Sequence, residues 1–102
     1  MQITTRSDAS QITLVLQGRF DFHTHRNFRG AYEPALEDGH AKELIIDLGG
    51  VDYLDSSALG MLLLLRERAA NLGKGVTLAK MHGTVEQVLD VANFDKIFSM
   101  RA

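Results

Sequence analysis

The stretch that decides the fold is ELIIDLGGVDYLDSSALGMLLLLRERAANLGKGVTLA, residues 43–79. Two short apolar runs, at residues 44–48 and 75–79, each predict a buried strand. Between them, residues 55–72 predict a helix, because helix-capping residue types precede the segment and Gly73 follows it. A strand, a helix and a strand within about forty residues form a βαβ unit, so the two strands should be parallel.

A hairpin is predicted on the N-terminal side of this unit. Residues 11–17, QITLVLQ, alternate apolar and polar side chains, which is typical of a strand with one buried face. A shorter strand at residues 1–5 should pair with it, because the intervening residues 7–10 are rich in turn formers.

Two more helices flank the βαβ unit. Apolar residues recur every three or four positions over residues 24–38, with Thr24 as the expected cap. The other helix is predicted to start at Thr84, which has the spacing of a capping box with Gln87. The aromatic tail that follows should cover the sheet or add a last short strand. The predicted fold class is therefore α/β, one domain over residues 1–102 with a four- or five-stranded mixed sheet packed with helices.

Composition excludes several classes of function. The 102 residues carry a formal net charge of −2, which does not suit a strongly basic nucleic-acid-binding domain. There is no cysteine, so disulfides, thiol catalysis and cysteine-based zinc sites are excluded. The longest apolar run is far shorter than the ~20 residues of a membrane span, and the first residues lack a signal-peptide pattern. We therefore expect a cytoplasmic protein that does not insert into a membrane.

The segment with the clearest chemistry lies just before the central helix. Asp55, Ser56 and Ser57 are all helix-capping residue types, and one interpretation is that they only cap the helix. A second interpretation starts from the same geometry, because a helix N-terminus has free N–H groups and a partial positive charge that favour an anion. A phosphate on Ser56 would add about −1.5 to −2 charges beside Asp52 and Asp55. The motif is thus compatible with a switch that acts on a partner surface.

The run Asp55-Ser56-Ser57-Ala58-Leu59-Gly60 resembles the STAS domain of bacterial anti-sigma factor antagonists. The resemblance extends over nearly the whole chain and includes Gly18-Arg19-Phe20-Asp21 and the turn Gly73-Lys74-Gly75. It implies a STAS-type α/β fold, a single STAS domain over residues 1–102, and a binding protein that is not an enzyme. The family commonly has glycine where Ala58 stands, a mild departure because alanine favours a helix more than glycine does.

The resemblance also implies a mechanism. Ser56 is the expected phosphoacceptor, and Ser57 is the less favoured neighbour. The kinase is expected to be the partner itself, an anti-sigma factor with a GHKL-type ATP-binding fold, so ATP belongs to the kinase and this chain needs no cofactor or metal. A PP2C-type phosphatase would reverse the reaction, and the unphosphorylated chain would bind the anti-sigma factor and release the sigma factor. Asp21 matches an acidic position that the family places near the serine.

A partner-binding surface follows from these assignments, and Met61 joins it as a candidate exposed contact because methionine adapts to irregular surfaces. The expected partner-binding residues are Asp21, Asp55, Ser56, Ser57, Ala58 and Met61. Nothing in the sequence demands more than a monomer or a weak dimer.

Three alternatives stay open. The chain could be a STAS adaptor subunit of another complex, stressosome-like or lipid-transporting, without a sigma-factor output. A small hydrolase could use Ser56 with His25 and Asp21, although a triad is defined by geometry that a sequence does not supply. His23 and His25 could bind a metal, but no carboxylate–histidine helix motif accompanies them.

Overall fold

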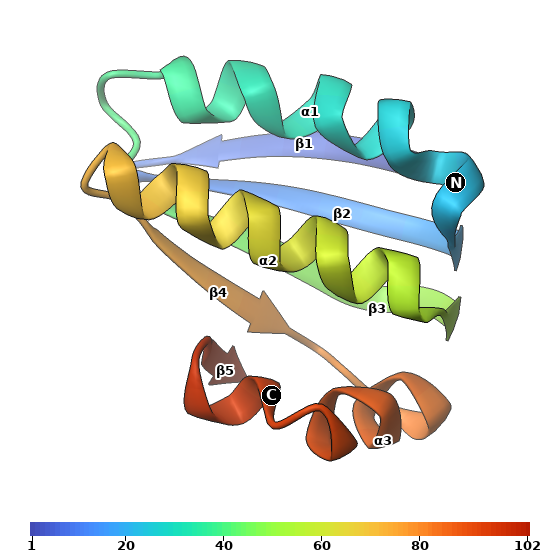
Figure 1. Ribbon diagram of the computed structural model, residues 1–102. Helices are drawn as coiled ribbons and strands as arrows, with labels where there is room; N and C mark the ends of the chain where they lie inside the picture. The colour runs from blue at the N-terminus through green and yellow to red at the C-terminus, as the bar shows by residue number, and fades with distance from the viewer.

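Five strands lie side by side in the order in which they occur along the chain, β1-β2-β3-β4-β5 (Figure 1). The computed structural model describes residues 1–102. The strands are β1 (Gln2–Asp8), β2 (Gln11–Phe20), β3 (Glu43–Leu54), β4 (Gly75–Ala79) and β5 (Ser99–Arg101). The helices are α1 (His25–Glu37), α2 (Ser56–Asn71) and α3 (Gly83–Val91), with short 3-10 turns η1 (Phe22–Thr24) and η2 (Phe94–Lys96).

The sheet is mixed, as predicted. β1 and β2 form an antiparallel hairpin, whereas β2, β3, β4 and β5 are mutually parallel. The predicted parallel βαβ unit is confirmed, and the tail, for which two arrangements were left open, forms the last short strand β5. None of the helices is both long enough and apolar enough to cross a membrane.

All helices lie on one face of the sheet. Each parallel connection steps to the next strand in the same direction, and right-handed crossovers in one direction place their helices on one face. Figure 1 shows α1 and α2 across this face. One hydrophobic core of 25 residues joins the helices to the sheet, and it includes Leu14 from β2, Ile46 from β3, Leu62 from α2 and Val85 from α3. The opposite face of the sheet carries no helix.

The ends of α2 follow from its sequence. Asp55 is the N-cap, with extended backbone, and Ser56 is the first helical residue. At the other end, Gly73 adopts a left-handed φ of 72°, which glycine tolerates without a steric penalty. Its N–H donates to the carbonyl of Ala70 at 3.0 Å, and the N–H of Lys74 donates to that of Ala69 at 2.8 Å. Both predicted helix ends are therefore confirmed.

The third strand is longer than predicted. The apolar run predicted a strand over residues 44–48, but β3 continues through Gly49 and Gly50 to Leu54. A side chain at Gly50 would lie 2.9 Å from the carbonyl oxygen of Leu16, so glycine here permits a close approach of β2 and β3. The register between these strands shifts at the same place, between Val15 and Gln17. The glycine pair therefore marks an irregular stretch within a continuing strand.

One predicted cap is wrong, and another occupies the expected position without a capping hydrogen bond. α3 begins at Gly83 with His82 at the N-cap and no side-chain cap, so Thr84 lies inside the helix and forms no capping box. Thr24 does stand at the N-cap of α1, but its hydroxyl donates to the carbonyl of Asp21 at 2.7 Å instead of capping the helix.

Candidate functional site

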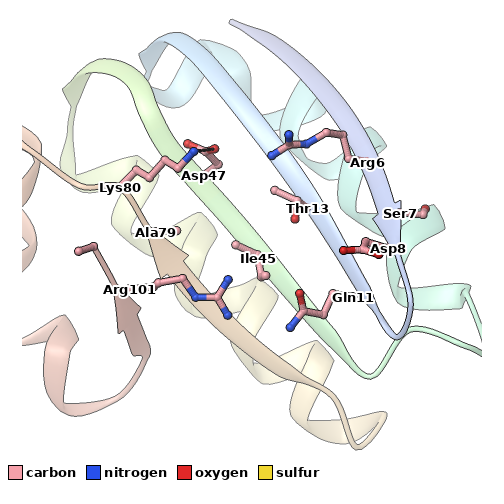
Figure 2. A pocket seen from close by; sticks show the side chains of 11 residues that line it. Arg6, Ser7, Asp8, Gln11, Thr13, Ile45, Asp47, Ala79, Lys80 and Arg101 are labelled. Atoms are coloured by element: carbon pink, nitrogen blue, oxygen red, sulfur yellow. Dashed lines mark ion pairs between the residues drawn. The ribbon is translucent and has the colours of Figure 1, made fainter.

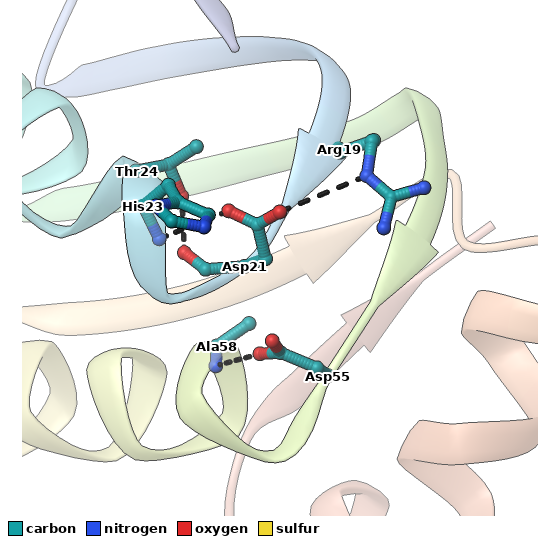
Figure 3. A network of polar contacts seen from close by, with 6 residues as sticks. All are labelled: Arg19, Asp21, His23, Thr24, Asp55 and Ala58. Atoms are coloured by element: carbon teal, nitrogen blue, oxygen red, sulfur yellow. Dashed lines mark hydrogen bonds and ion pairs between the residues drawn. The ribbon is translucent and has the colours of Figure 1, made fainter.

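The carboxyl ends of β2 and β3 meet beside the N-terminus of α2. Phe20 and Leu54 are the last paired residues of these two strands, and Asp21 and Asp55 follow them directly. The backbone N–H of Asp55 donates to the carbonyl of Phe20 at 3.3 Å, which ties the two chain segments together. Figure 3 shows both carboxylates at this edge of the sheet, with the first turn of α2 below them. The predicted residues Asp21 and Asp55 thus share one edge with Ser56.

Asp55 caps α2, as the simpler of the two interpretations predicted. Its Oδ1 accepts a hydrogen bond from the backbone N–H of Ala58 at 3.0 Å. Ser56 and Ser57 follow in the first turn, and both are exposed. No hydrogen bond within the chain engages the Ser56 hydroxyl, so it is free to react with another protein.

Asp21 holds the neighbouring loop. Its Oδ1 accepts from the backbone N–H of His23 at 3.0 Å, and its Oδ2 lies 3.7 Å from Nε of Arg19 (Figure 3). The Arg19 guanidinium also lies over the Tyr53 ring, 4.0 Å from its centroid. Sequence reasoning missed this arginine–tyrosine pair. Arg19 and Tyr53 are register partners, but that is visible only once β3 is known to extend past the glycine pair.

Two of the predicted contact residues lie largely inside the molecule. Ala58 is fully buried, and Met61 is only 7% exposed. Both belong to the hydrophobic core, because they lie on the side of α2 that packs into the molecule. The expectation that the Ala58 side chain contacts a partner is therefore wrong, and Met61 reaches the surface only at its edge.

Two exposed apolar residues near the serines were not among the predicted partner-binding residues. Phe22 is 60% exposed in η1, and Leu64 is half-exposed on α2. With His25, Ser57, Gly60 and the edge of Met61 they line a shallow hollow of about 400 Å³ between η1, α1 and α2. The four consecutive leucines of α2 indicate exposed apolar surface, because a helix with one buried side must expose part of such a run. Leu62 and Leu65 are buried, and Leu63 and Leu64 are the exposed members.

The site does not have the geometry of a hydrolase or a metal centre. The Asp21 carboxylate interacts with the His23 backbone and with Arg19, and it does not orient the His25 imidazole. His25 lines the hollow beside Ser57 and forms no hydrogen bond to Ser56. Nowhere in the molecule do three or more histidine or acidic side chains gather as a group that could hold a metal ion.

Comparisons with known proteins agree on one family. A family model described as "Mlab, STAS domain" matches residues 3–101. A STAS-domain containing protein from Pseudomonas aeruginosa is 40% identical over 94 residues, which cover 92% of this chain and 91% of that protein. An anti-sigma F factor antagonist from Paenibacillus polymyxa is 23% identical over 97 residues, which cover 95% of this chain and 83% of that protein.

The solved structures agree with this fold. The anti-sigma factor antagonist SpoIIAA in its unphosphorylated form superimposes with a TM-score of 0.82 at 19% identity, covering 99% of this chain and 88% of that chain. The phosphorylated form of SpoIIAA, from Bacillus, gives a TM-score of 0.75 at 18% identity, covering 99% of this chain and 91% of that chain. The predicted α/β fold, with a five-stranded mixed sheet and three helices, is confirmed.

Proposed function

Because this chain belongs to the STAS domain family, we propose that it is an anti-sigma factor antagonist whose binding to an anti-sigma factor is switched by phosphorylation of Ser56. The observation that carries this proposal is the exposed, unbonded hydroxyl of Ser56 at the first position of α2. The relative that is named an anti-sigma F factor antagonist, and the phosphorylated form in which SpoIIAA has been solved, support the same function.

The chain supplies only the phosphoacceptor. The partner, an anti-sigma factor kinase with a GHKL-type fold, supplies ATP. Ser56 Oγ attacks the γ-phosphorus, a new P–O bond forms, the bond to ADP breaks, and the hydroxyl proton leaves to a base on the kinase. A PP2C-type phosphatase hydrolyses the phosphoserine and restores the hydroxyl. In this proposal the chain binds no cofactor and catalyses no reaction, and it acts as a monomer or weak dimer in the cytoplasm.

The local charge explains how a phosphate would act on the partner. The carboxylates of Asp21 and Asp55 lie near the start of α2 (Figure 3), and Asp52 is an exposed residue of β3, three positions before Asp55. A phosphate would add about −1.5 to −2 charges there, and the partial positive charge of the helix N-terminus tolerates it. A partner surface that fits the neutral serine would then face a strongly acidic patch. A tenfold loss of affinity requires only about 1.4 kcal/mol, which such repulsion readily exceeds.

The exposed apolar residues complete the proposed partner surface. Phe22 and Leu64 present hydrocarbon beside Ser57, in the hollow between η1 and α2. In protein–protein interfaces, a few aromatic residues that become buried at the centre, surrounded by a charged rim, usually dominate the binding energy. We therefore assign Phe22 and Leu64 to this surface in place of Ala58, with Met61 at its edge.

A second candidate is a STAS adaptor subunit of another complex, stressosome-like or lipid-transporting, without a sigma-factor output. The observation that favours it is that the 40% identical relative is described only by its STAS domain. Such an adaptor could bind its partner through the same surface. Its binding would not depend on phosphorylation of Ser56.

The first experiment is phosphopeptide mapping on protein isolated from its native cells. Trypsin releases residues 43–66 as one peptide that holds both Ser56 and Ser57. Fragmentation that places a condition-dependent phosphate on Ser56, together with a co-purifying kinase, supports the switch. A phosphate found only on Ser57 overturns the choice of residue. A peptide that is never phosphorylated, in protein that still holds its partner, favours the adaptor.

A further inference from the structure

The face of the sheet without helices contains a hollow whose floor is buried. Its central residues are Ile45 and Asp47 on β3 and Ala79 on β4, and all three are between 3% and 6% exposed. Ile45 and Ala79 are buried but do not belong to the hydrophobic core that joins the helices to the sheet, so they lie on the opposite face. No helix explains their burial. Long side chains from the sheet edges enclose them instead.

These side chains surround a hollow of about 430 Å³ (Figure 2). Arg6 comes from β1 and Arg101 from β5, the two edge strands of the sheet. Four inter-strand steps of about 4.8 Å separate these strands, so only long side chains can reach across. Figure 2 shows both guanidinium groups directed inward over the middle strands. Lys80, just after β4, lies beside them.

Charges of both signs line the hollow, and the last residue, Ala102, lines it as well. Its side chains carry three positive charges, on Arg6, Lys80 and Arg101, and two negative charges, on Asp8 and Asp47. Lys80 Nζ lies 3.5 Å from Asp47 Oδ2, so these two neutralise each other. The other ion pairs of the molecule involve Arg19, Arg29 and Arg68, and none involves Arg6 or Arg101. Two guanidinium groups therefore face the hollow without a carboxylate partner.

We propose that this hollow binds a small organic anion with two negatively charged groups, one held by Arg6 and the other by Arg101. A guanidinium presents a planar fork of N–H donors that matches a carboxylate or a phosphate. Two such forks from opposite edges suit a ligand with one anionic group at each end. Between them, Ile45 and Ala79 provide a small apolar floor for a short hydrocarbon chain. This site lies on the opposite face of the sheet from the core-packed helices and does not depend on the function proposed for Ser56.

The test is a titration of the full chain, followed by the amide NMR signals of the floor residues. The probes are succinate, which carries two carboxylates, and 3-phosphoglycerate, which carries a carboxylate and a phosphate. Acetate at the same ionic strength is the single-charge control. We expect saturable shifts at Ile45 and Ala79 with succinate, with 3-phosphoglycerate or with both, and the preferred probe identifies the second anionic group. Equal shifts with acetate, or no saturation with either dianion, would overturn the proposal.

Variants assign the arginines. R6Q and R101Q should each weaken the binding of the preferred probe about 10- to 100-fold, as expected for the loss of a charge-assisted pair. The matched control is R26Q, which removes an exposed arginine of α1 that forms no ion pair, and it should leave the affinity unchanged. R6K and R101K keep the charge without the fork and should lie between wild type and glutamine. If R26Q weakens binding as much as R6Q, the effect is one of net charge and the proposed site is wrong.

Discussion

Removing the Asp55 carboxylate should destabilise the start of α2 by an amount that can be worked out from its contacts. Asp55→Ala deletes the acceptor of the 3.0 Å hydrogen bond from the Ala58 N–H, and losing an N-cap costs about 1 kcal/mol, within a range of about 0.5–2. It also removes a negative charge from a helix N-terminus, which contributes about 0.3–1 kcal/mol. The expected loss in the free energy of unfolding is therefore about 1–2 kcal/mol. In a domain of about 100 residues, 1 kcal/mol corresponds to a fall in Tm of roughly 4–8 °C.

Urea denaturation and thermal melts of three variants check this reasoning. Asp55→Asn keeps the oxygen acceptor without the charge, so it should lose only the helix-dipole share. Asp52→Ala removes an exposed carboxylate near the end of β3 that forms no hydrogen bond or ion pair, and its stability should stay within about 0.5 kcal/mol of wild type. If Asp55→Ala is no less stable than Asp52→Ala, the cap does not hold the helix start, and the account of how Ser56 is positioned fails.

Three further predictions follow from other parts of the molecule. In calorimetry, Ser56→Ala should bind the anti-sigma factor at least as tightly as wild type, whereas the affinity of Ser56→Asp should be lower by about tenfold or more. Equal affinities of the two variants would refute the phosphorylation switch. Gly50→Ala should lower the free energy of unfolding, measured with denaturant, by about 1–3 kcal/mol, because the new Cβ would lie 2.9 Å from the Leu16 carbonyl oxygen of β2. Gly30→Ala should instead stabilise the protein, because no atom lies within 4 Å of the new Cβ and alanine favours the α1 helix more than glycine does. The backbone N–H of His40 donates to the Asp38 carboxylate and lowers the pKa of that carboxyl below 3.8. The hydrogen bond therefore stabilises the folded chain at pH values above the pKa that Asp38 has in the unfolded chain. This stabilisation is lost as the pH falls through the lower pKa that Asp38 has in the folded chain. NMR titration of the Asp38 carboxyl should place its midpoint below 3.8, and a midpoint at or above 3.8 would contradict the hydrogen-bond geometry.

The pattern of apolar residues was sufficient for most of the fold. Alternation predicted β2, the two apolar runs predicted the buried centre of β3 and all of β4, and the capping residues predicted both ends of α2. Patterns failed where a residue acts through a distant neighbour. Glycine at position 50 reads as a strand breaker in isolation, and its role in the close approach to Leu16 exists only after β2 and β3 have paired. The start of α3 was missed for a similar reason, because its N-cap lacks the side-chain bond that a sequence pattern can detect.

At the candidate site, too, some features could be predicted from the sequence and others depend on tertiary packing. The resemblance to the family implied that Asp21 lies near Ser56. The structure gives the physical reason, because the carboxyl ends of the adjacent parallel strands β2 and β3 share one edge of the sheet. The exposure of individual side chains on α2 could not be predicted from the sequence. Met61 and Leu64 are both apolar and three positions apart, yet one is buried and the other is half-exposed. Only the packing of α2 between its neighbours and the sheet decides which apolar residue a partner can reach.

The hydrogen bonds around the site indicate where a phosphate on Ser56 would have its effect. The Asp55 carboxylate already accepts from the backbone of α2, and the Asp21 carboxylate from the backbone of η1. The Ser56 hydroxyl takes part in no hydrogen bond of the chain, so its modification breaks nothing that holds the fold. A bound phosphate would gain from the helix N-terminus about as much as it loses to the nearby carboxylates, since each exposed interaction is worth about 0.3–1 kcal/mol. The free energy of unfolding should therefore change little, and the cost of the added charge falls on any partner that must bury this surface.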